Sequence, residues 1–341
     1  MNLRLVKTAL SVALWPALLL TACQKPALQY RQNSGEIFHT TYHITYEGGR
    51  DWQAQIDSCL QRFDASLSMF NPASTLSRIN LAGTEPTDVR DDAWLCHLMD
   101  KAMEISALTG GAFDITVAPL VNLWGFGLSK SSDVTAAEVD SVRSFVGYEK
   151  LAWDGRCVTK ADARMMLDAS AIAKGYACDV VAQLLDSLGS RNYLVEIGGE
   201  IVLKGKNARQ QVWTVGIDRP NDDPLALDRH LQTALQISDK AMATSGNYRN
   251  FYTRDGRKVA HTIDPSTGFP VTHSLLSATV LADDCLTADA LATSFMVMGF
   301  ERARSLSLQL PGIWCFFISS DEKGDFVTWC SPALEAYMRQ I

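Results

Sequence analysis

The sequence lacks the short motifs of several common protein classes. It contains no C-x-x-C pair, no Cys/His spacing of a zinc site, no G-x-G-x-x-G after a strand and no G-x-S-x-G elbow. These absences argue against a zinc protein, a Rossmann-type dinucleotide-binding protein and a serine hydrolase. There is also no basic stripe with interleaved aromatic residues, and the formal net charge is −7. We therefore expect no nucleic-acid partner.

Repeats, low-complexity tracts and long linkers are missing as well. A chain of 341 residues is long enough for one large domain or two closely joined lobes. Helix-like and strand-like hydrophobic patterns alternate, which predicts an α+β fold with a sizeable mixed sheet and helices packed on it. We expect a helix that begins at about Asp51, a second over Asp92 to Leu108 and a third over Ile172 to Leu188. The clearest expected strands are Phe38 to Glu47, Tyr193 to Ile197, Gln211 to Asp218, Leu231 to Ser238 and Val259 to Ile263.

The first 22 residues have the pattern of an export signal. Arg4 and Lys7 precede an apolar run that Pro16 interrupts, and Leu20-Thr21-Ala22-Cys23 resembles a bacterial lipobox. We expect a lipoprotein signal peptide over 1–22, lipidation of Cys23, a polar tether over 23–35 and a folded domain over 36–341. A plain cleaved signal or a retained membrane helix is the alternative. The expected location is the bacterial cell envelope, with the protein held on a membrane by its lipid anchor and facing the periplasm.

Seven cysteines remain besides Cys23, an odd number. Two expected strands, Trp314 to Ser319 and Asp325 to Trp329, flank a turn around 321–324. A turn centred between residues 322 and 323 places Cys315 opposite Cys330, which predicts a cross-strand disulfide. The alternative is that both thiols are small buried hydrophobic groups.

The chemically richest stretch runs from Val259 to Phe295. His261 precedes a rigid Asp-Pro-Ser-Thr-Gly corner at 264–268. Asp283 and Asp284 are N-cap candidates for a following helix, on which Asp289 and Thr293 are one turn apart. A carboxylate and a hydroxyl on one helical face suit Mg²⁺, which prefers oxygen ligands. The same spacing also fits a capped helix whose threonine is bonded to its own backbone.

Several stretches together resemble the ApbE family of flavin transferases. They occur in the family's order at Gly111 to Leu120, Asn122 to Gly127, Leu167 to Tyr176, Glu196 to Glu200, Thr244 to Tyr252, His261 to Val271 and Thr287 to Thr293. The resemblance covers about residues 36–335. It implies a fold related to the T-fold and built of two similar halves. It also implies Mg²⁺-dependent transfer of FMN from FAD to a Thr or Ser hydroxyl of a target flavoprotein, with release of AMP.

The resemblance also assigns roles to individual residues. His261 would be the catalytic base, and the Ala171 carbonyl, Asp289 and Thr293 would bind Mg²⁺. FAD would be held by Phe38, Phe70, Ala112, Phe113, Asp114, Asp168, Lys174 and Ile263. The family's usual Met-Gly-Thr is Phe38-His39-Thr40 here, and Ala292 provides no second acid for another metal.

Other functions fit the same residues. An FAD pyrophosphatase releasing FMN and AMP would use the same base and metal, and a non-catalytic flavin-binding lipoprotein would need neither. The resemblance suggests that the acceptors are exported flavin-carrying subunits of membrane redox complexes.

Overall fold

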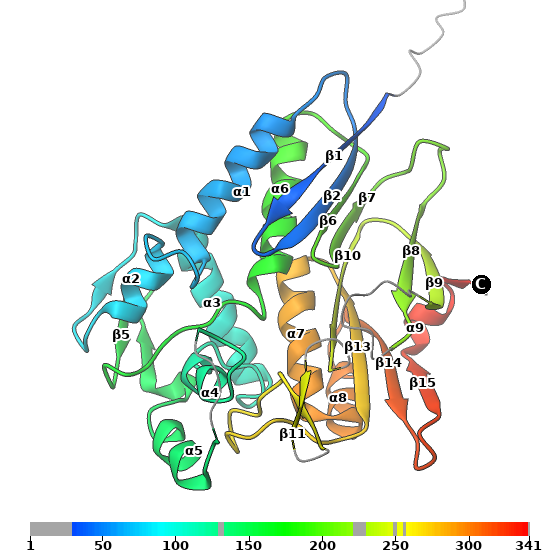
Figure 1. Ribbon diagram of the computed structural model, residues 1–341. Coiled ribbons are helices and arrows are strands. Elements are labelled where there is room, and N and C mark those ends of the chain that lie inside the picture. The colour runs from blue at the N-terminus through cyan, green and yellow to red at the C-terminus, as the bar shows by residue number, and fades with distance from the viewer. Residues whose placement is uncertain (1–28, 129–132, 221–229, 248–250, 255–256, 340–341) are drawn as a thin grey trace, which may run out of the picture.

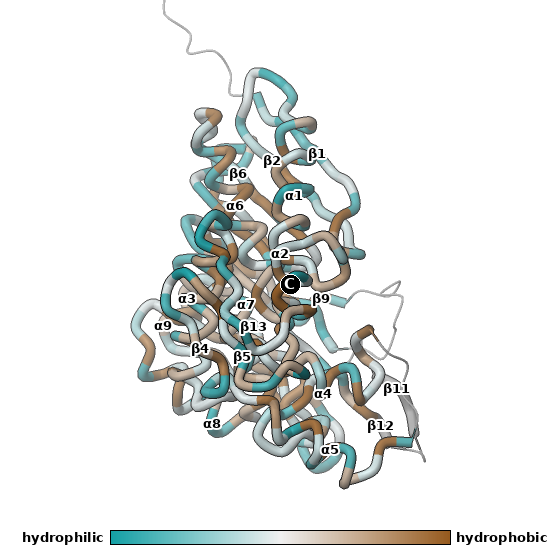
Figure 2. The backbone as a smooth tube through the Cα atoms, turned by 90° about the vertical axis from the view of Figure 1, so that its left-hand side faces the viewer, coloured by the Kyte–Doolittle hydropathy of each residue, from teal (hydrophilic) through white to brown (hydrophobic). Residues whose placement is uncertain are grey.

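The computed structural model describes residues 29–128, 133–220, 230–247, 251–254 and 257–339 (Figure 1). Cys23 and the whole of the predicted signal peptide lie outside these ranges. Within them, none of the helices combines the length and the apolar character that crossing a membrane requires. Figure 2 shows an elongated molecule with α1, β1 and β2 at one end and α5, α8 and β11 at the other.

An eight-stranded sheet forms the centre of the molecule. Its spatial order is β1-β2-β6-β7-β10-β13-β14-β15, and each pair of neighbours is antiparallel. The predicted α+β class is therefore confirmed, but this sheet is antiparallel and not mixed as we expected. The strands are β1 (Tyr30–Ile37), β2 (Thr40–Glu47), β6 (Tyr193–Ile197), β7 (Glu200–Lys204), β10 (Lys240–Gly246), β13 (Leu275–Ala282), β14 (Trp314–Ser320) and β15 (Phe326–Cys330).

The sheet consists of two halves with the same order of elements. In the first half β1 and β2 precede helix α6 (Ala173–Ser187), and β6 and β7 follow it. In the second half β10 and β13 precede helix α7 (Cys285–Met298), and β14 and β15 follow it. The β7–β10 ladder joins the halves, so α6 and α7 lie next to each other on one face of a continuous sheet.

The two faces of the sheet are covered differently. The main hydrophobic core lies between the sheet and the helices, with Tyr42, Phe63 and Phe317 among its largest buried side chains. On the other face a smaller core contains Trp213, Phe316 and Leu334 beneath a three-stranded sheet. That sheet comprises β8 (Trp213–Asp218), β9 (Leu231–Ile237) and β16 (Met338–Arg339).

The remaining elements surround this frame. The other helices are α1 (Gln53–Leu67), α2 (Thr75–Leu81), α3 (Ala93–Leu108), α4 (Ala118–Leu123), α5 (Ala136–Arg143), α8 (Phe300–Ser307), α9 (Pro332–Glu335) and the 3-10 turn Tyr148–Lys150. The other strands are β3 (Thr87–Asp88), β4 (Leu151–Trp153), β5 (Cys157–Lys160), β11 (Phe251–Arg254) and β12 (Arg257–Ala260). The sequence patterns therefore placed α1, α3 and α6 within a few residues of their bounds.

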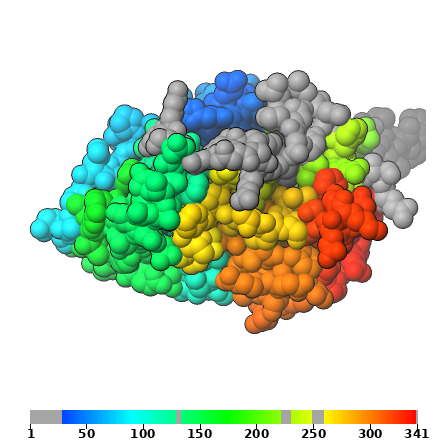
Figure 3. Space-filling view, turned by 60° about the horizontal axis from the view of Figure 1, so that its bottom comes forward, coloured from blue at the N-terminus to red at the C-terminus, as the bar shows by residue number. Residues whose placement is uncertain are grey.

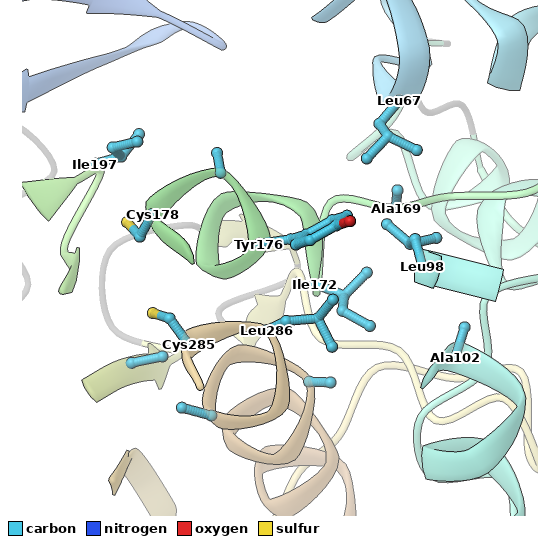
Figure 4. Packing of buried hydrophobic residues seen from close by; sticks show 14 of the residues in the cluster. Leu67, Leu98, Ala102, Ala169, Ile172, Tyr176, Cys178, Ile197, Cys285 and Leu286 are labelled. Atoms are coloured by element: carbon cyan, nitrogen blue, oxygen red, sulfur yellow. The ribbon is translucent and has the colours of Figure 1, made fainter. Parts of the chain in front are cut away.

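Helices α6 and α7 approach each other unusually closely at Gly175. A Cβ atom built on Gly175 would lie 2.2 Å from the Cys285 carbonyl oxygen and 2.7 Å from Asp289 Cβ. One turn further along α6, Asp179 accepts hydrogen bonds from the backbone N–H groups of Cys285 (2.9 Å) and Leu286 (2.8 Å). Figure 4 shows this crossing, with Cys178 on α6 and Cys285 on α7. The Asp179 carboxylate thus satisfies free donors at the N-terminus of the neighbouring helix.

The folded domain starts earlier than predicted. Residues 30–35, assigned to the tether, form most of β1, which pairs with β2 from Tyr30↔Glu47 to Ile37↔Thr40. The single strand expected over 38–47 is therefore the second strand of a hairpin, whose turn contains Phe38 and His39 at φ 52° and 58°. The polar sequence of β1 gives no strand pattern. As an edge strand, β1 depends on hydrogen bonds to its one neighbour more than on burial of an apolar face.

The predicted Cys315–Cys330 disulfide is wrong, because both cysteines are free. The register is Ser320↔Phe326, so the loop is one residue longer than we assumed and Cys330 lies opposite Phe316. A shift of one residue moves a side chain to the other face of the sheet. Cys315 accordingly belongs to the main core, and Cys330 packs against the smaller core on the opposite face.

We predict that Gly175→Ala destabilises the protein by about 1–3 kcal/mol, because its new methyl group must displace the α7 backbone. Urea unfolding measures this loss. Gly49→Ala is the control, because a Cβ there meets no atom within 4 Å. Equal unfolding midpoints for the two variants would contradict the close crossing.

Candidate active site

A cavity of about 460 Å³ lies among the N-terminal part of α6, α7, β10 and the corner after β12. It brings together residues that are up to 228 positions apart in the sequence, from Met69 to Val297. The predicted site residues that line it are Phe70, Ala112, Phe113, Asp114, Asp168, Ala171, Lys174, His261, Ile263, Asp289 and Thr293.

A second cavity of about 410 Å³ adjoins the first and contains the remaining predicted contact, Phe38. The two cavities share Met69, Phe70, Ser170 and Lys174. In this structure Phe38 and Phe70 each pack on another aromatic ring. The ring centroids of Phe38 and Phe63 are 5.7 Å apart, and those of Phe70 and His39 are 5.6 Å apart. Phe70 is 49% exposed. Phe70 is thus an accessible aromatic surface between the two cavities.

Three residues with oxygen atoms that could bind a metal line the cavity where α6 begins beside α7. Asp289 is 3% exposed, and its Oδ2 accepts the Gly175 N–H at 2.9 Å. In a regular helix that N–H would bond to the carbonyl of Ala171, four residues earlier. Among the residues that the structure describes, no group donates to this carbonyl, which is therefore available to a ligand. Thr293 lies one turn beyond Asp289, and its hydroxyl shares a 3.0 Å hydrogen bond with Ser245 on β10.

A lysine lies between two buried carboxylates beside these oxygens. Lys174 Nζ is 2.9 Å from Glu200 Oε1 and 3.8 Å from Asp289 Oδ2. Burial lowers the pKa of Lys174, but Asp289 and Glu200 outweigh this effect and raise the pKa overall. Lys174 therefore stays protonated and contributes a positive charge to the cavity.

Asp168 and Asp114 are both buried, but their surroundings differ. Asp168 Oδ1 accepts the Ser170 N–H at 2.7 Å, directly before α6, and burial raises its pKa. Asp114 accepts from the Thr116 N–H (2.8 Å) and hydroxyl (2.7 Å) and from the Tyr148 N–H (2.9 Å). Burial raises the pKa of Asp114. The three hydrogen bonds lower this pKa, but the effect of burial is larger. Both oxygens of Asp114 are thus engaged in holding the cavity wall.

The corner after β12 places His261 at the cavity from the opposite side. Ile263 bridges to Pro270, and Gly268 N–H donates to the Asp264 carbonyl at 2.7 Å, which closes the predicted turn. Trp124 Nε1 donates to the Gly268 carbonyl at 2.8 Å and so attaches the corner to α4. Figure 3 shows the segment around α4 (blue-green) and the corner after β12 (yellow) side by side on one face of the molecule. The His261 ring lies 6.3 Å from that of Phe126.

Sequence reasoning missed several residues of the cavity. Met69, Ser170, Gly198, Glu200 and Ser245 line it, although none was assigned a role. Glu200 and Ser245 lie within stretches that carried the family resemblance, which was the available signal. Residues 248–250 of the stretch Thr244 to Tyr252 lie outside the described ranges.

The arrangement places several oxygen atoms, the Lys174 ammonium group and the His261 imidazole around one cavity. No group of three or more His, Cys, Asp or Glu side chains in the described ranges is placed to hold a metal. The convergent donors are one carboxylate, one hydroxyl and one main-chain carbonyl. Such a set suits Mg²⁺, which keeps several waters and takes its other ligands from a phosphate group.

Comparison with known proteins gives consistent results. The family model for the ApbE family matches residues 38–317. An FAD:protein FMN transferase from Vibrio cholerae is 41% identical over 305 residues, which cover 87% of this chain and 89% of that protein. The Haemophilus influenzae protein of the same name is 34% identical over 345 residues, or 97% of each chain.

Solved structures agree with the sequence matches. The flavin transferase ApbE from Vibrio cholerae superposes with a TM-score of 0.81 at 36% identity, covering 91% of this chain and 99% of that one. The apo form of the Pseudomonas stutzeri flavinyl transferase ApbE gives a TM-score of 0.80 at 31% identity, covering 91% and 97%.

We predict that Asp114→Asn lowers the free energy of unfolding by about 1–3 kcal/mol, because the new amide NH₂ faces the Tyr148 N–H. Urea unfolding tests this, with the exposed Asp91→Asn as the control. An unchanged midpoint for the Asp114 variant would show that its hydrogen bonds do not hold the wall.

Proposed function

This chain belongs to the ApbE family and is an enzyme of the FAD:protein FMN transferase class, and on that premise we propose how its cavity performs the transfer. The donor substrate is FAD, and the acceptor is a Thr or Ser hydroxyl of a flavoprotein. Magnesium assists the reaction, and AMP is released. The observation that carries this proposal is the convergence of Asp289, Thr293 and the free Ala171 carbonyl in the cavity that also contains His261.

These oxygens fit a magnesium ion. The Gly175 N–H holds Asp289 Oδ2 at 2.9 Å, so the carboxylate is oriented before any ligand arrives. The Thr293 hydroxyl can donate to Ser245 and keep its lone pairs for a cation. When bound there, Mg²⁺ would neutralise charge on the pyrophosphate oxygens of FAD. The positive charge of Lys174, which lines both cavities, would help hold the same pyrophosphate.

The chemistry is a phosphoryl transfer in which one P–O bond replaces another. The acceptor hydroxyl oxygen attacks the FMN-side phosphorus, and the bond from that phosphorus to the AMP oxygen breaks. AMP leaves with the electron pair of this bond, and FMN becomes linked to the acceptor through a phosphoester. His261, which lines the cavity, takes the hydroxyl proton as the general base.

The aromatic residues suit the flavin end of the donor. Phe70 is half exposed where the two cavities meet, so its ring is free to stack on an isoalloxazine or adenine ring. Phe38, Phe63 and Met69 make the second cavity largely apolar. Together the cavities offer room for both an apolar ring system and a charged pyrophosphate.

The acceptor and the location of the enzyme follow from the same proposal. We infer that the targets are exported flavin-carrying subunits of membrane redox complexes, which present their Thr or Ser in the periplasm. Cleavage before Cys23 and lipidation of its thiol would anchor the enzyme to a membrane of the cell envelope. An enzyme held there meets its acceptors on the exported side. Mass spectrometry of the N-terminal peptide from membranes would show diacylglycerol on Cys23, and an unmodified thiol would exclude the anchor.

The first test is the intact mass of a Thr-containing flavin domain incubated with the enzyme, FAD and Mg²⁺. We expect a gain of one esterified FMN and equimolar AMP, with neither formed in EDTA. Free FMN and AMP without an adduct would instead indicate an FAD pyrophosphatase. Intact, bound FAD would indicate a flavin-binding protein.

Two substitutions should separate the base from the metal site. His261→Ala should slow transfer by about 10²- to 10⁴-fold with little change in the KM for FAD, since a positioned base contributes that much. Asp289→Ala should abolish the response to Mg²⁺ together with activity. His43→Ala is the control, because His43 pairs with Glu196 on the exposed side of β2 and does not line the cavity. Full activity of the His261 variant would exclude it as the base.

A further inference from the structure

Glu200 is a buried cavity residue with one oxygen atom unused. It begins β7 directly after the tight turn at Gly198 and Gly199, and it is 4% exposed. Oε1 accepts from Lys174 Nζ at 2.9 Å. Oε2 is fully buried and has no hydrogen-bond partner among the described residues. A buried carboxylate oxygen without a donor is costly, which indicates that something else uses it during function.

Lys174 connects this carboxylate with the candidate metal site. Its ammonium group carries three N–H donors, of which one is accounted for by Glu200 Oε1. The second neighbour, Asp289 Oδ2, is 3.8 Å away, which is an ion pair but too long for a hydrogen bond. The ammonium therefore lies beside the carboxylate that we assign to Mg²⁺.

The aliphatic chain of Lys174 is positioned so that its ammonium group can reach the carboxylates of both Glu200 and Asp289. A Cβ atom on Gly198 would lie 3.2 Å from Lys174 Cδ, so the glycine leaves room for the lysine chain against the β6–β7 turn. The turn also places Glu200 opposite Ile197, whose side chain is in the core on the helix face of the sheet. The Glu200 carboxylate consequently points toward α6 and α7.

We propose that Lys174 acts as an internal counter-cation for Asp289, and that Glu200 is the positioning residue that draws it away when a divalent cation binds. This rests on the magnesium site proposed above. Without metal, the ammonium offsets the charge of both carboxylates. When the cation arrives, the ammonium moves fully onto Glu200, where the unused Oε2 accepts a second N–H bond. Lys174 then remains beside the cavity for the pyrophosphate.

The proposal predicts opposite effects of two neutralising substitutions on cation affinity. Lys174→Gln removes the ammonium group that competes with the cation for Asp289, and it should tighten cation binding by about tenfold. The Coulomb energy of a unit charge 3.8 Å from this carboxylate corresponds to at least that factor. Glu200→Gln leaves the ammonium only Asp289 as a partner and should weaken binding by about tenfold. The probe is Mn²⁺ alone, titrated into the full chain without FAD and followed by the electron paramagnetic resonance signal of the free ion, with Mg²⁺ as competitor.

A double substitution separates repositioning from simple charge. If Glu200 acts through Lys174, then Glu200→Gln in the Lys174→Gln background should change affinity less than about twofold. A tenfold loss in that background would overturn the proposal, as would single variants that shift affinity in the same direction. Lys174→Met repeats the test if the glutamine variant unfolds, and thermal melting verifies folding in each case.

Two controls distinguish this proposal from the one on which it rests. Asp289→Asn should abolish Mg²⁺-competed Mn²⁺ binding, and if it does not, the proposed metal site itself is wrong. Glu196→Gln removes a carboxylate from the same β6–β7 hairpin, where Glu196 accepts from the Gly199 N–H and pairs with His43. Affinity should be unchanged in this variant, and a loss equal to that of Glu200→Gln would show a nonspecific charge effect.

Discussion

The hydrogen bond from the Gly175 N–H to the Asp289 carboxylate connects the two halves of this protein beside its candidate active-site cavity. It requires α6 and α7 to approach so closely that a Cβ on residue 175 would lie 2.2 Å from the α7 backbone. The bond has two consequences. It orients Asp289, and it diverts the N–H that would otherwise occupy the carbonyl of Ala171.

The larger architecture maintains this contact. Each half of the sheet supports one of the helices, and the antiparallel β7–β10 ladder fixes the halves relative to each other. Asp179 adds a second connection by accepting both N–H groups at the start of α7. The His261 corner approaches from the other side and is attached to α4 by Trp124. Phosphoryl transfer depends on such positioning more than on a strongly reactive side chain.

Charge is distributed unevenly in the cavity. Asp168, Glu200 and Asp289 are buried carboxylates, and Lys174 is the cation that contacts two of them. Buried carboxylates are stable only when paired or bonded, so a cluster of three beside one lysine favours a bound cation. In the proposed function, a divalent ion would offset the charge of the carboxylates and hold the anionic pyrophosphate beside them.

The sequence alone determined those features that depend on local chemistry. Asp289 and Thr293 are one helical turn apart in any helix, and the Asp264 to Gly268 corner and the strand Tyr193 to Ile197 follow from turn residues and from alternation. The α+β class followed from the alternating hydrophobic patterns, and the family followed from the order of the stretches. Eleven of the predicted site residues line one cavity, and all of them except Phe70 lie within such a stretch.

Only the tertiary structure decided the features that depend on pairing between distant segments. Strand β1 is polar and owes its conformation to β2, and the register of β14 and β15 separates Cys315 from Cys330 by a shift of one residue. Lys174 pairs with Glu200 and Asp289, which are 26 and 115 residues away in the sequence. Local propensity contains no information about such distances, because hydrogen-bond geometry and burial arise only when the chain has folded.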